Sequence, residues 1–190
     1  MFQKLLKYGV SGNLLHVLQS MYFKLKSCVK LNGKLSDFFN CNVGLMQGES
    51  LSPFLYAIYV NDMEIELIIH GIQSYELRML NLYLFMYADD TVLFSENVHD
   101  LQKMIDTVNE CSVEKGLHIN LSKTKIVVFR SKGIVKQNEK WYLNGNFIDI
   151  CDEFMYLGLL FNYNGSFTNT QKVLTDQGRK AVFYLYSQNT

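Results

Sequence analysis

The chain is poor in proline and in closely spaced cysteines. Pro53 is the single proline among 190 residues, and the four cysteines lie far apart with no C-x-x-C pair. This spacing predicts neither a zinc ribbon nor a disulfide framework, so we expect reduced thiols. No repeat or low-complexity tract marks a linker. The composition favours one folded domain, because 48% apolar and 14% aromatic residues are enough to build a core.

Long apolar runs are also lacking. The first residues contain no continuous apolar segment of the signal-peptide type, and the apolar stretch 51–69 is broken by Asp62, Glu64 and Glu66. We therefore expect no signal peptide, no membrane span and no membrane partner. An intracellular protein, in the nucleus or the cytoplasm, is the expectation that follows.

Charge is unevenly distributed although the formal net charge is zero. The first 36 residues contain six lysines and no acidic residue, residues 37–114 have a balance of −11, and residues 115–140 have a balance of +6. A single charge run is most often only a solvated face. Two basic blocks around an acidic block would also suit a polyanion held over a carboxylate centre that binds cations.

The most informative stretch is LYLFMYADDTVLFS, residues 82–95. Two apolar runs flank a short polar break, which predicts a β-hairpin with Asp89 and Asp90 at its turn. Because both runs are nearly all apolar, we expect both faces of the hairpin to be covered and its tip to be largely dry. Two interpretations remain open here: a solvated acidic turn, or a Mg²⁺ site in which a hard cation relieves the repulsion between the carboxylates.

Apolar spacing predicts helices at residues 13–25, 53–69, 97–114 and 166–190. A hairpin is predicted at 28–42 with its turn at Asn32–Gly33, the apolar residues Val29, Leu31 and Leu35 pointing inward, and lysines on the other face. Short strands are predicted at 117–120, at 126–129 and within 141–163.

The segment before the second helix contains Gly44, Gln47 and Gly48, followed by Ser52 as a natural N-cap and Pro53 at the first helical position. A plain loop and helix start explains this pattern. A loop of this kind could also lie against a nucleic-acid backbone or base, with Gln47 as the hydrogen-bonding side chain.

Four motifs follow one another along the chain: GLMQGESLSPFLYAIYVND at 44–62, YADD at 87–90, GLHINLSKTK at 116–125 and FMYLGLLF at 154–161. In this order and spacing they resemble the reverse transcriptase of non-LTR retrotransposons, the LINE-like relatives of group II intron enzymes. The resemblance implies an α+β fold: a palm made of an antiparallel sheet with helices packed on one face, and the start of a helical thumb. It assigns residues 1–150 to the palm and residues 151–190 to the primer-grip hairpin and the start of the thumb.

The resemblance also implies roles for individual residues. Asp89 and Asp90 would be catalytic and bind Mg²⁺, with Mn²⁺ as an alternative, and Lys123 would lie near the leaving pyrophosphate. The implied contacts to nucleic acid or nucleotide are Gln47, Gly48, Ser52, Pro53, Tyr87, Ala88, Tyr156, Leu157 and Gly158. The implied partners are an RNA template, a DNA primer and a deoxynucleoside triphosphate.

Two departures from the family pattern change the expected activity. Met46 stands where the family usually has arginine, and the family's first catalytic aspartate is not found before Leu5–Val10. We therefore expect a fragment of an RNA-directed DNA polymerase that is truncated at its N-terminus and inactive alone. A non-enzymatic nucleic-acid-binding module and a decayed retroelement product are the alternatives, and a metal nuclease is a more distant one.

Overall fold

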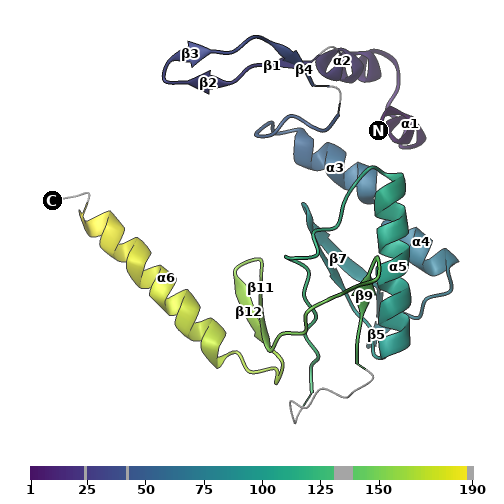
Figure 1. Ribbon diagram of the computed structural model, residues 1–190, viewed down its shortest axis with the longest axis vertical. Coiled ribbons are helices and arrows are strands. Elements are labelled where there is room, and N and C mark those ends of the chain that lie inside the picture. Colours follow the sequence, from purple (N-terminus) through teal and green to yellow (C-terminus); the bar gives the residue numbers. More distant parts are fainter. Residues whose placement is uncertain (24, 42, 131–138, 188–190) are drawn as a thin grey trace. The chain divides into compact units, whose positions relative to one another are not determined.

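Short helices and strands alternate along the chain in a computed structural model that describes residues 1–23, 25–41, 43–130 and 139–187 (Figure 1). The helices are α1 (Phe2–Lys7), α2 (Gly12–Tyr22), α3 (Ser52–Val60), α4 (Met63–Ile69), α5 (Val98–Glu114) and α6 (Thr168–Ser187). The strands are β1 (Lys26–Ser27), β2 (Lys30–Leu31), β3 (Lys34–Leu35), β4 (Phe39–Asn40), β5 (Tyr75–Leu77), β6 (Leu80–Leu82), β7 (Leu84–Tyr87), β8 (Asp90–Leu93), β9 (Tyr142–Leu143), β10 (Asn146–Phe147), β11 (Glu153–Tyr156) and β12 (Leu159–Asn162). The predicted α+β class is confirmed.

The chain divides into two compact units. Unit 1 comprises Met1–Glu66 and Leu84–Val92, and unit 2 comprises Leu67–Tyr83 and Leu93–Thr190. Within the described residues, none of the helices is both long and apolar enough to cross a membrane.

Unit 1 has a core built from helices α1, α2 and α3. Its buried members are Leu5, Leu15, Leu18 and Leu55. Helix α2 confirms the predicted helix at 13–25, although it ends three residues earlier, whereas α1 was not expected from the sequence. The Lys4 ammonium of α1 forms an ion pair with Asp62 at 2.7 Å, which ties α1 to the end of α3.

Unit 2 has a core around the apolar face of helix α5. Its buried members are Ile105, Ile126, Trp141, Leu143 and Ile148. The helix begins as predicted: Asn97 is its N-cap, and the side chain of Asn97 accepts a hydrogen bond from the Asp100 backbone N–H at 2.8 Å. The indole N–H of Trp141 donates to the Val98 carbonyl at 3.0 Å, which fixes the first turn of α5 over this core.

The strands pair two by two within the described residues, as β1–β4, β2–β3, β5–β6, β7–β8, β9–β10 and β11–β12. The resemblance predicted one palm sheet, and the structure instead contains these small antiparallel pairs. The strands predicted at 117–120 and 126–129 are wrong. Ile126 forms an isolated parallel bridge with Ile150, and the segment between the two predicted strands is held as a turn by Asn120.

The helix predicted at 53–69 is interrupted. It is divided into α3 and α4 at Asn61 and Asp62. Both side chains at this break have partners near α1: the Asn61 amide donates to the Tyr8 hydroxyl at 2.7 Å, and Asp62 pairs with Lys4. These contacts hold the two residues outside a continuous helix. The predicted helix at 166–190 is confirmed as α6, and residues 188–190 lie outside the described residues.

The hairpin predicted at 28–42 forms over residues 26–40, and residue 42 lies outside the described residues, but the faces of the hairpin were predicted wrongly. Val29, Leu31 and Leu35 are 58%, 70% and 62% exposed instead of pointing inward. The two-residue turn at Asn32–Gly33 places Leu31 opposite Lys34 and Lys30 opposite Leu35. Directly paired residues share a face, so each face carries one lysine and one leucine from these strands.

Candidate active site

Asp89 and Asp90 lie at the turn of the predicted hairpin, which the structure confirms as β7 and β8. Ala88 and Asp89 form the loop, and Asp90 is the first residue of β8. Both carboxylates are exposed, as are Tyr87 at 64% and Phe85 at 48%. The expectation of a hairpin covered on both faces was therefore wrong. Side chains alternate along β7, and Leu84 and Met86 are half-buried while Phe85 and Tyr87 are not.

The turn has a backbone feature that the sequence did not reveal. Ala88 has a φ of 51°, in the left-handed region that glycine or asparagine usually occupies. The hairpin continues beyond its strands, because the Phe94 N–H donates to the Tyr83 carbonyl at 3.1 Å. Paired strands thus hold a conformationally strained loop, and the carboxylates of Asp89 in this loop and of Asp90 at the start of β8 are both exposed to solvent.

Tyr56 of helix α3 belongs to the surroundings of this turn. Burial raises the pKa of the Tyr56 hydroxyl, and the negative charge of Asp89 raises this pKa further. The turn with Asp89 and Asp90 therefore lies near α3, the helix that follows the loop with Gly44 and Gly48, which we call the glycine-containing loop. Sequence reasoning missed Tyr56, because a tyrosine on an apolar helix face gives no signal of a carboxylate 33 positions later.

The segment 44–53 is anchored by Ser52. This residue is buried, and its Oγ donates to the Met46 carbonyl at 2.6 Å instead of capping α3, for which Leu51 is the N-cap. Gly48 has a φ of 86°, and an added Cβ would meet no atom within 4 Å, so backbone conformation and not crowding requires glycine here. Gln47 and Pro53 are exposed.

One further group, the Tyr22 hydroxyl, contacts this loop. The Tyr22 hydroxyl of α2 lies 3.4 Å from a carboxylate oxygen of Glu49 and 3.4 Å from the Ser52 Oγ. The sequence did not indicate that Tyr22 would contact the loop. Tyr22 of α2 thus contacts two residues of this segment, Glu49 and Ser52, while Gln47 is exposed to solvent.

In unit 2, Lys123 lies on a turn organised by Asn120. The Asn120 side-chain oxygen accepts hydrogen bonds from the backbone N–H groups of Ser122 at 3.0 Å and Lys123 at 3.3 Å. Lys123 is exposed, and no ion pair occupies its ammonium among the described residues. Lys125 forms an ion pair with Asp149 at 2.6 Å. Of the two lysines in this motif, Lys123 is the one with an unengaged charge.

Tyr156, Leu157 and Gly158 lie at the tip of the β11–β12 hairpin, also in unit 2. Leu157 and Gly158 form its loop with φ values of 48° and 82°, and Leu157 is 49% exposed. Thr170 at the start of α6 donates to the Leu160 carbonyl, which links this hairpin to the following helix. The loop therefore presents an apolar side chain to solvent at a strained backbone position.

The predicted site residues fall into two groups. Unit 1 contains Gln47, Gly48, Ser52, Pro53, Tyr87, Ala88, Asp89 and Asp90, and unit 2 contains Lys123, Tyr156, Leu157 and Gly158. Within the described residues, no group of three or more His, Cys, Asp or Glu side chains could hold a metal ion. Asp89 and Asp90 offer two carboxylates, whose hard oxygens suit Mg²⁺ or Mn²⁺ with water or phosphate oxygens completing the coordination.

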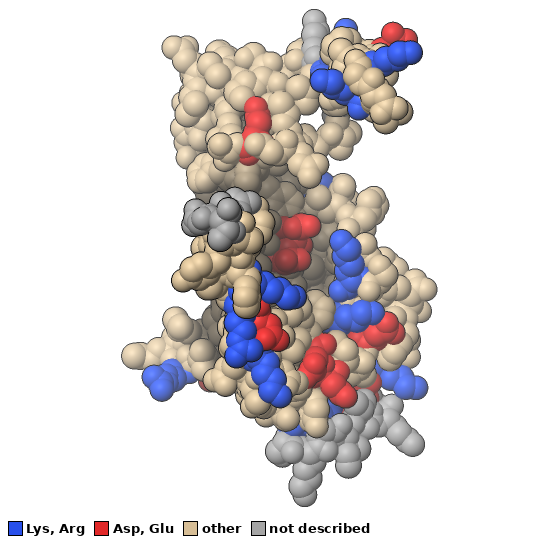
Figure 2. Space-filling model, turned by 90° about the vertical axis from the view of Figure 1, so that its left-hand side faces the viewer, with Lys and Arg blue, Asp and Glu red and all other residues tan. Residues whose placement is uncertain are grey.

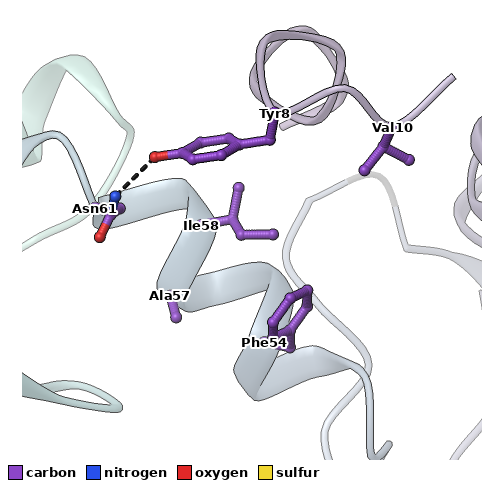
Figure 3. Close-up of a pocket in the computed structure, with 6 residues that line it drawn as sticks. All are labelled: Tyr8, Val10, Phe54, Ala57, Ile58 and Asn61. Carbon is purple, nitrogen blue, oxygen red and sulfur yellow. Dashed lines mark hydrogen bonds between the residues drawn. The ribbon is translucent and has the colours of Figure 1, made fainter.

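An apolar hollow of about 400 Å³ lies beside helix α3, apart from these residues. It is lined by Tyr8, Val10, Phe54, Ala57, Ile58 and Asn61. Figure 3 shows the Tyr8 ring above α3, with its hydroxyl bonded to the Asn61 amide at 2.7 Å. None of the predicted site residues lines this hollow.

The sequence pattern of the reverse transcriptase (RNA-dependent DNA polymerase) family matches residues 2–161. The chain belongs to this family. The RNA-directed DNA polymerase from the mobile element jockey of Drosophila funebris is 25% identical over 164 residues, which are 83% of this chain and 17% of that protein. The resemblance to non-LTR retrotransposon reverse transcriptases is thus confirmed. All four sequence motifs lie within the residues that match the family pattern.

Proposed function

We propose that this chain contributes three parts of an RNA-directed DNA polymerase: the carboxylates of Asp89 and Asp90, the glycine-containing loop and the primer-grip hairpin. One observation carries the proposal: Asp89 lies near Tyr56, so the YADD turn and the helix after the glycine-containing loop meet in one compact unit. Residues 1–150 would form the palm, and residues 151–190 the primer-grip hairpin and the start of the thumb. The substrates would be an RNA template, a DNA primer and a deoxynucleoside triphosphate.

Asp89 and Asp90 would hold Mg²⁺, with Mn²⁺ as an alternative. When bound, a pair of such ions stabilises the attacking and leaving oxygens of nucleotidyl transfer. The two carboxylates are well placed for this role because both are exposed at the tip of a hairpin. Tyr87 and Ala88 would abut the primer end, where the small side chain of Ala88 leaves room for the sugar.

Lys123 would act on the leaving pyrophosphate. Its exposed ammonium can neutralise the developing negative charge or donate a proton from Nζ to a phosphate oxygen. Asn120 fixes the backbone of this turn and is therefore a positioning residue. The ion pair between Lys125 and Asp149 favours Lys123 over Lys125 for the role.

The remaining contacts would orient the nucleic acid. Gln47 would reach the template or the incoming nucleotide from the exposed turn before α3, while Met46 supplies no charge where the family usually has arginine. Tyr156, Leu157 and Gly158 would hold the primer strand. Because the described residues gather two carboxylates at the turn and not three, we propose that these 190 residues bind primed template without extending it efficiently.

A binding experiment tests this proposal. A fluorescent DNA primer annealed to an RNA template is titrated with the 190-residue chain at increasing Mg²⁺, and anisotropy is measured. We expect Mg²⁺ to strengthen binding of the wild-type chain in the presence of a deoxynucleoside triphosphate. Asp89→Asn combined with Asp90→Asn should abolish this dependence.

The control removes the same charge elsewhere. Glu96 and Glu110 are exposed acidic residues outside the site, so Glu96→Gln combined with Glu110→Gln should leave the Mg²⁺ dependence intact. An equal Mg²⁺ dependence in all three chains would show that these aspartates are not the ion site. An absence of binding to the primed template would overturn the proposal as a whole.

A further inference from the structure

The hairpin made of β1–β4, residues 26–40, is basic and exposed, and we call it the hairpin arm. It contains three lysines against one acidic residue, Asp37, and every residue from 29 to 40 is exposed. Figure 1 shows the hairpin arm extending away from helices α2 and α3 of its own unit. Figure 2 shows basic side chains gathered on it at the top of the view. The site described above does not account for this surface.

The pairing register divides the hairpin arm into two faces. Its pairs are Lys26 with Asn40, Ser27 with Phe39, Lys30 with Leu35, and Leu31 with Lys34. Between the outer and inner pairs the register shifts by one residue, so the returning strand contains one extra residue. This is a β-bulge, in which Asp37 and Phe38 oppose Cys28.

One face combines two lysines with an aromatic ring. Side chains alternate along a strand, so Lys26, Cys28 and Lys30 point to the same side. Asp37 and Phe38, which both oppose Cys28, fall between the two lysines on that side, and Phe38 is 67% exposed. The two lysines are four positions apart, which is roughly 13 Å along an extended strand.

The opposite face provides an internal comparison. Lys34 pairs with Leu31, and Phe39 pairs with Ser27, so both lie on the other side of the hairpin arm. Phe39 is 50% exposed. Each face therefore has an exposed phenylalanine, but one face has two lysines and Asp37 and the other has Lys34 alone as its charged residue.

We propose that the face formed by Lys26, Lys30 and Phe38 binds unpaired template RNA. Lysines neutralise phosphates, and an exposed aromatic ring between them can stack on an unpaired base, which is how proteins hold single strands without reading sequence. A protein partner fits less well, because burying this face would desolvate two ammonium groups for which Asp37 is the one acidic neighbour in the hairpin arm. The inference rests on the proposed function, to which it adds the position of the template strand.

Five single variants of the whole 190-residue chain test the proposal. Binding to a fluorescent single-stranded RNA without secondary structure is measured by anisotropy across a range of salt concentrations. Lys30→Gln should lower the slope of log K against log salt by about 0.7, and Phe38→Ala should weaken binding about 5-fold or more. Lys34→Gln and Phe39→Ala, on the opposite face, should leave both quantities unchanged. Lys30→Arg should retain the wild-type slope.

The possible failures are distinct. Equal losses on both faces would overturn the assignment to one face. Unchanged RNA affinity in all five variants, while the wild-type chain still binds RNA, would overturn this inference and leave the proposed function standing. An absence of binding to both the single strand and the primed template would overturn the inference and the proposed function together.

Discussion

The Tyr56 hydroxyl on helix α3 lies close enough to Asp89 in the β7–β8 loop for the carboxylate charge to raise its pKa. Burial of the tyrosine is the larger cause of the raised pKa, and the charge of Asp89 adds to it. Tyr56 is therefore a neutral hydroxyl at physiological pH and can donate a hydrogen bond. This relationship joins two of the four sequence motifs through a physical interaction.

Asp89→Asn should lower the pKa of Tyr56 without restoring its ordinary value, because burial of the tyrosine remains. NMR of ¹³C-labelled tyrosine rings measures this pKa, and Tyr56→Phe identifies the resonance. Asp90→Asn is the matched control, since Asp90 is not among the causes of the raised pKa. An equal effect of the two variants would show that both aspartates raise the pKa of Tyr56.

The raised pKa also affects stability at alkaline pH. A folded-state pKa above the unfolded value, about 10 for tyrosine, means that the unfolded chain loses its proton first. The contribution of Tyr56 is therefore complete below about pH 10 and declines as pH rises through the folded-state pKa. Thermal melting at pH 8 to 11 should show a smaller alkaline loss for Tyr56→Phe than for the wild-type chain. An identical loss would mean that other groups dominate.

Mg²⁺ should stabilise the fold modestly through Asp89 and Asp90. An ion at ten times its Kd adds about 1.4 kcal/mol to the free energy of unfolding. Asp89→Asn combined with Asp90→Asn should remove the Mg²⁺-dependent rise in melting temperature, measured by calorimetry. The rise should persist in the Glu96→Gln and Glu110→Gln control, and its persistence in the double asparagine variant would place the ions elsewhere.

Ala88→Gly should stabilise the hairpin, because the left-handed backbone at φ 51° costs an alanine about 1 kcal/mol that glycine avoids. Chemical denaturation measures the change. Ala57→Gly in the middle of α3 is the matched control, and there the same substitution should destabilise by about 0.5–1 kcal/mol. A loss of stability in Ala88→Gly would mean that the methyl group makes contacts that outweigh the strain.

Local chemistry explains which elements the sequence could predict. The turn at Asn32–Gly33 forms as predicted, because asparagine and glycine tolerate the positive φ values found at both residues. The N-cap of α5 at Asn97 is equally local. Such features depend on a few neighbouring residues, so their sequence signal is complete.

Features that depend on distant partners were missed or wrong. Leu31 and Leu35 are exposed because the hairpin arm extends away from the helices of its unit, which its own alternation does not record. Ser52 has the sequence signal of an N-cap, yet its hydroxyl bonds Met46. The break between α3 and α4 depends on Lys4, nearly sixty residues earlier. Each outcome was decided by how the segment is arranged against other parts of the chain, which its own sequence pattern does not record.

The purified chain should fail to extend a DNA primer on an RNA template. Efficient transfer requires the reacting oxygens to be held within a fraction of an ångström, and a misplaced group typically costs about 10²-fold in rate. Within the described residues, no third acidic side chain joins Asp89 and Asp90 in a possible metal site. Gel analysis of primer extension, with the jockey polymerase as positive control, measures the outcome.

Robust extension that Asp90→Asn abolishes would contradict this expectation and require another acid to complete the site. Asp62 and Glu49 are the candidates in unit 1, and both have partners: Asp62 pairs with Lys4 at 2.7 Å, and Glu49 lies 3.4 Å from the Tyr22 hydroxyl. Recruiting Asp62 would require its ion pair to break, whereas recruiting Glu49 would sacrifice a single long contact. Glu49→Gln should therefore lower any observed extension more than Asp62→Asn does, and the reverse order would show that the α3–α4 junction rearranges when substrate binds.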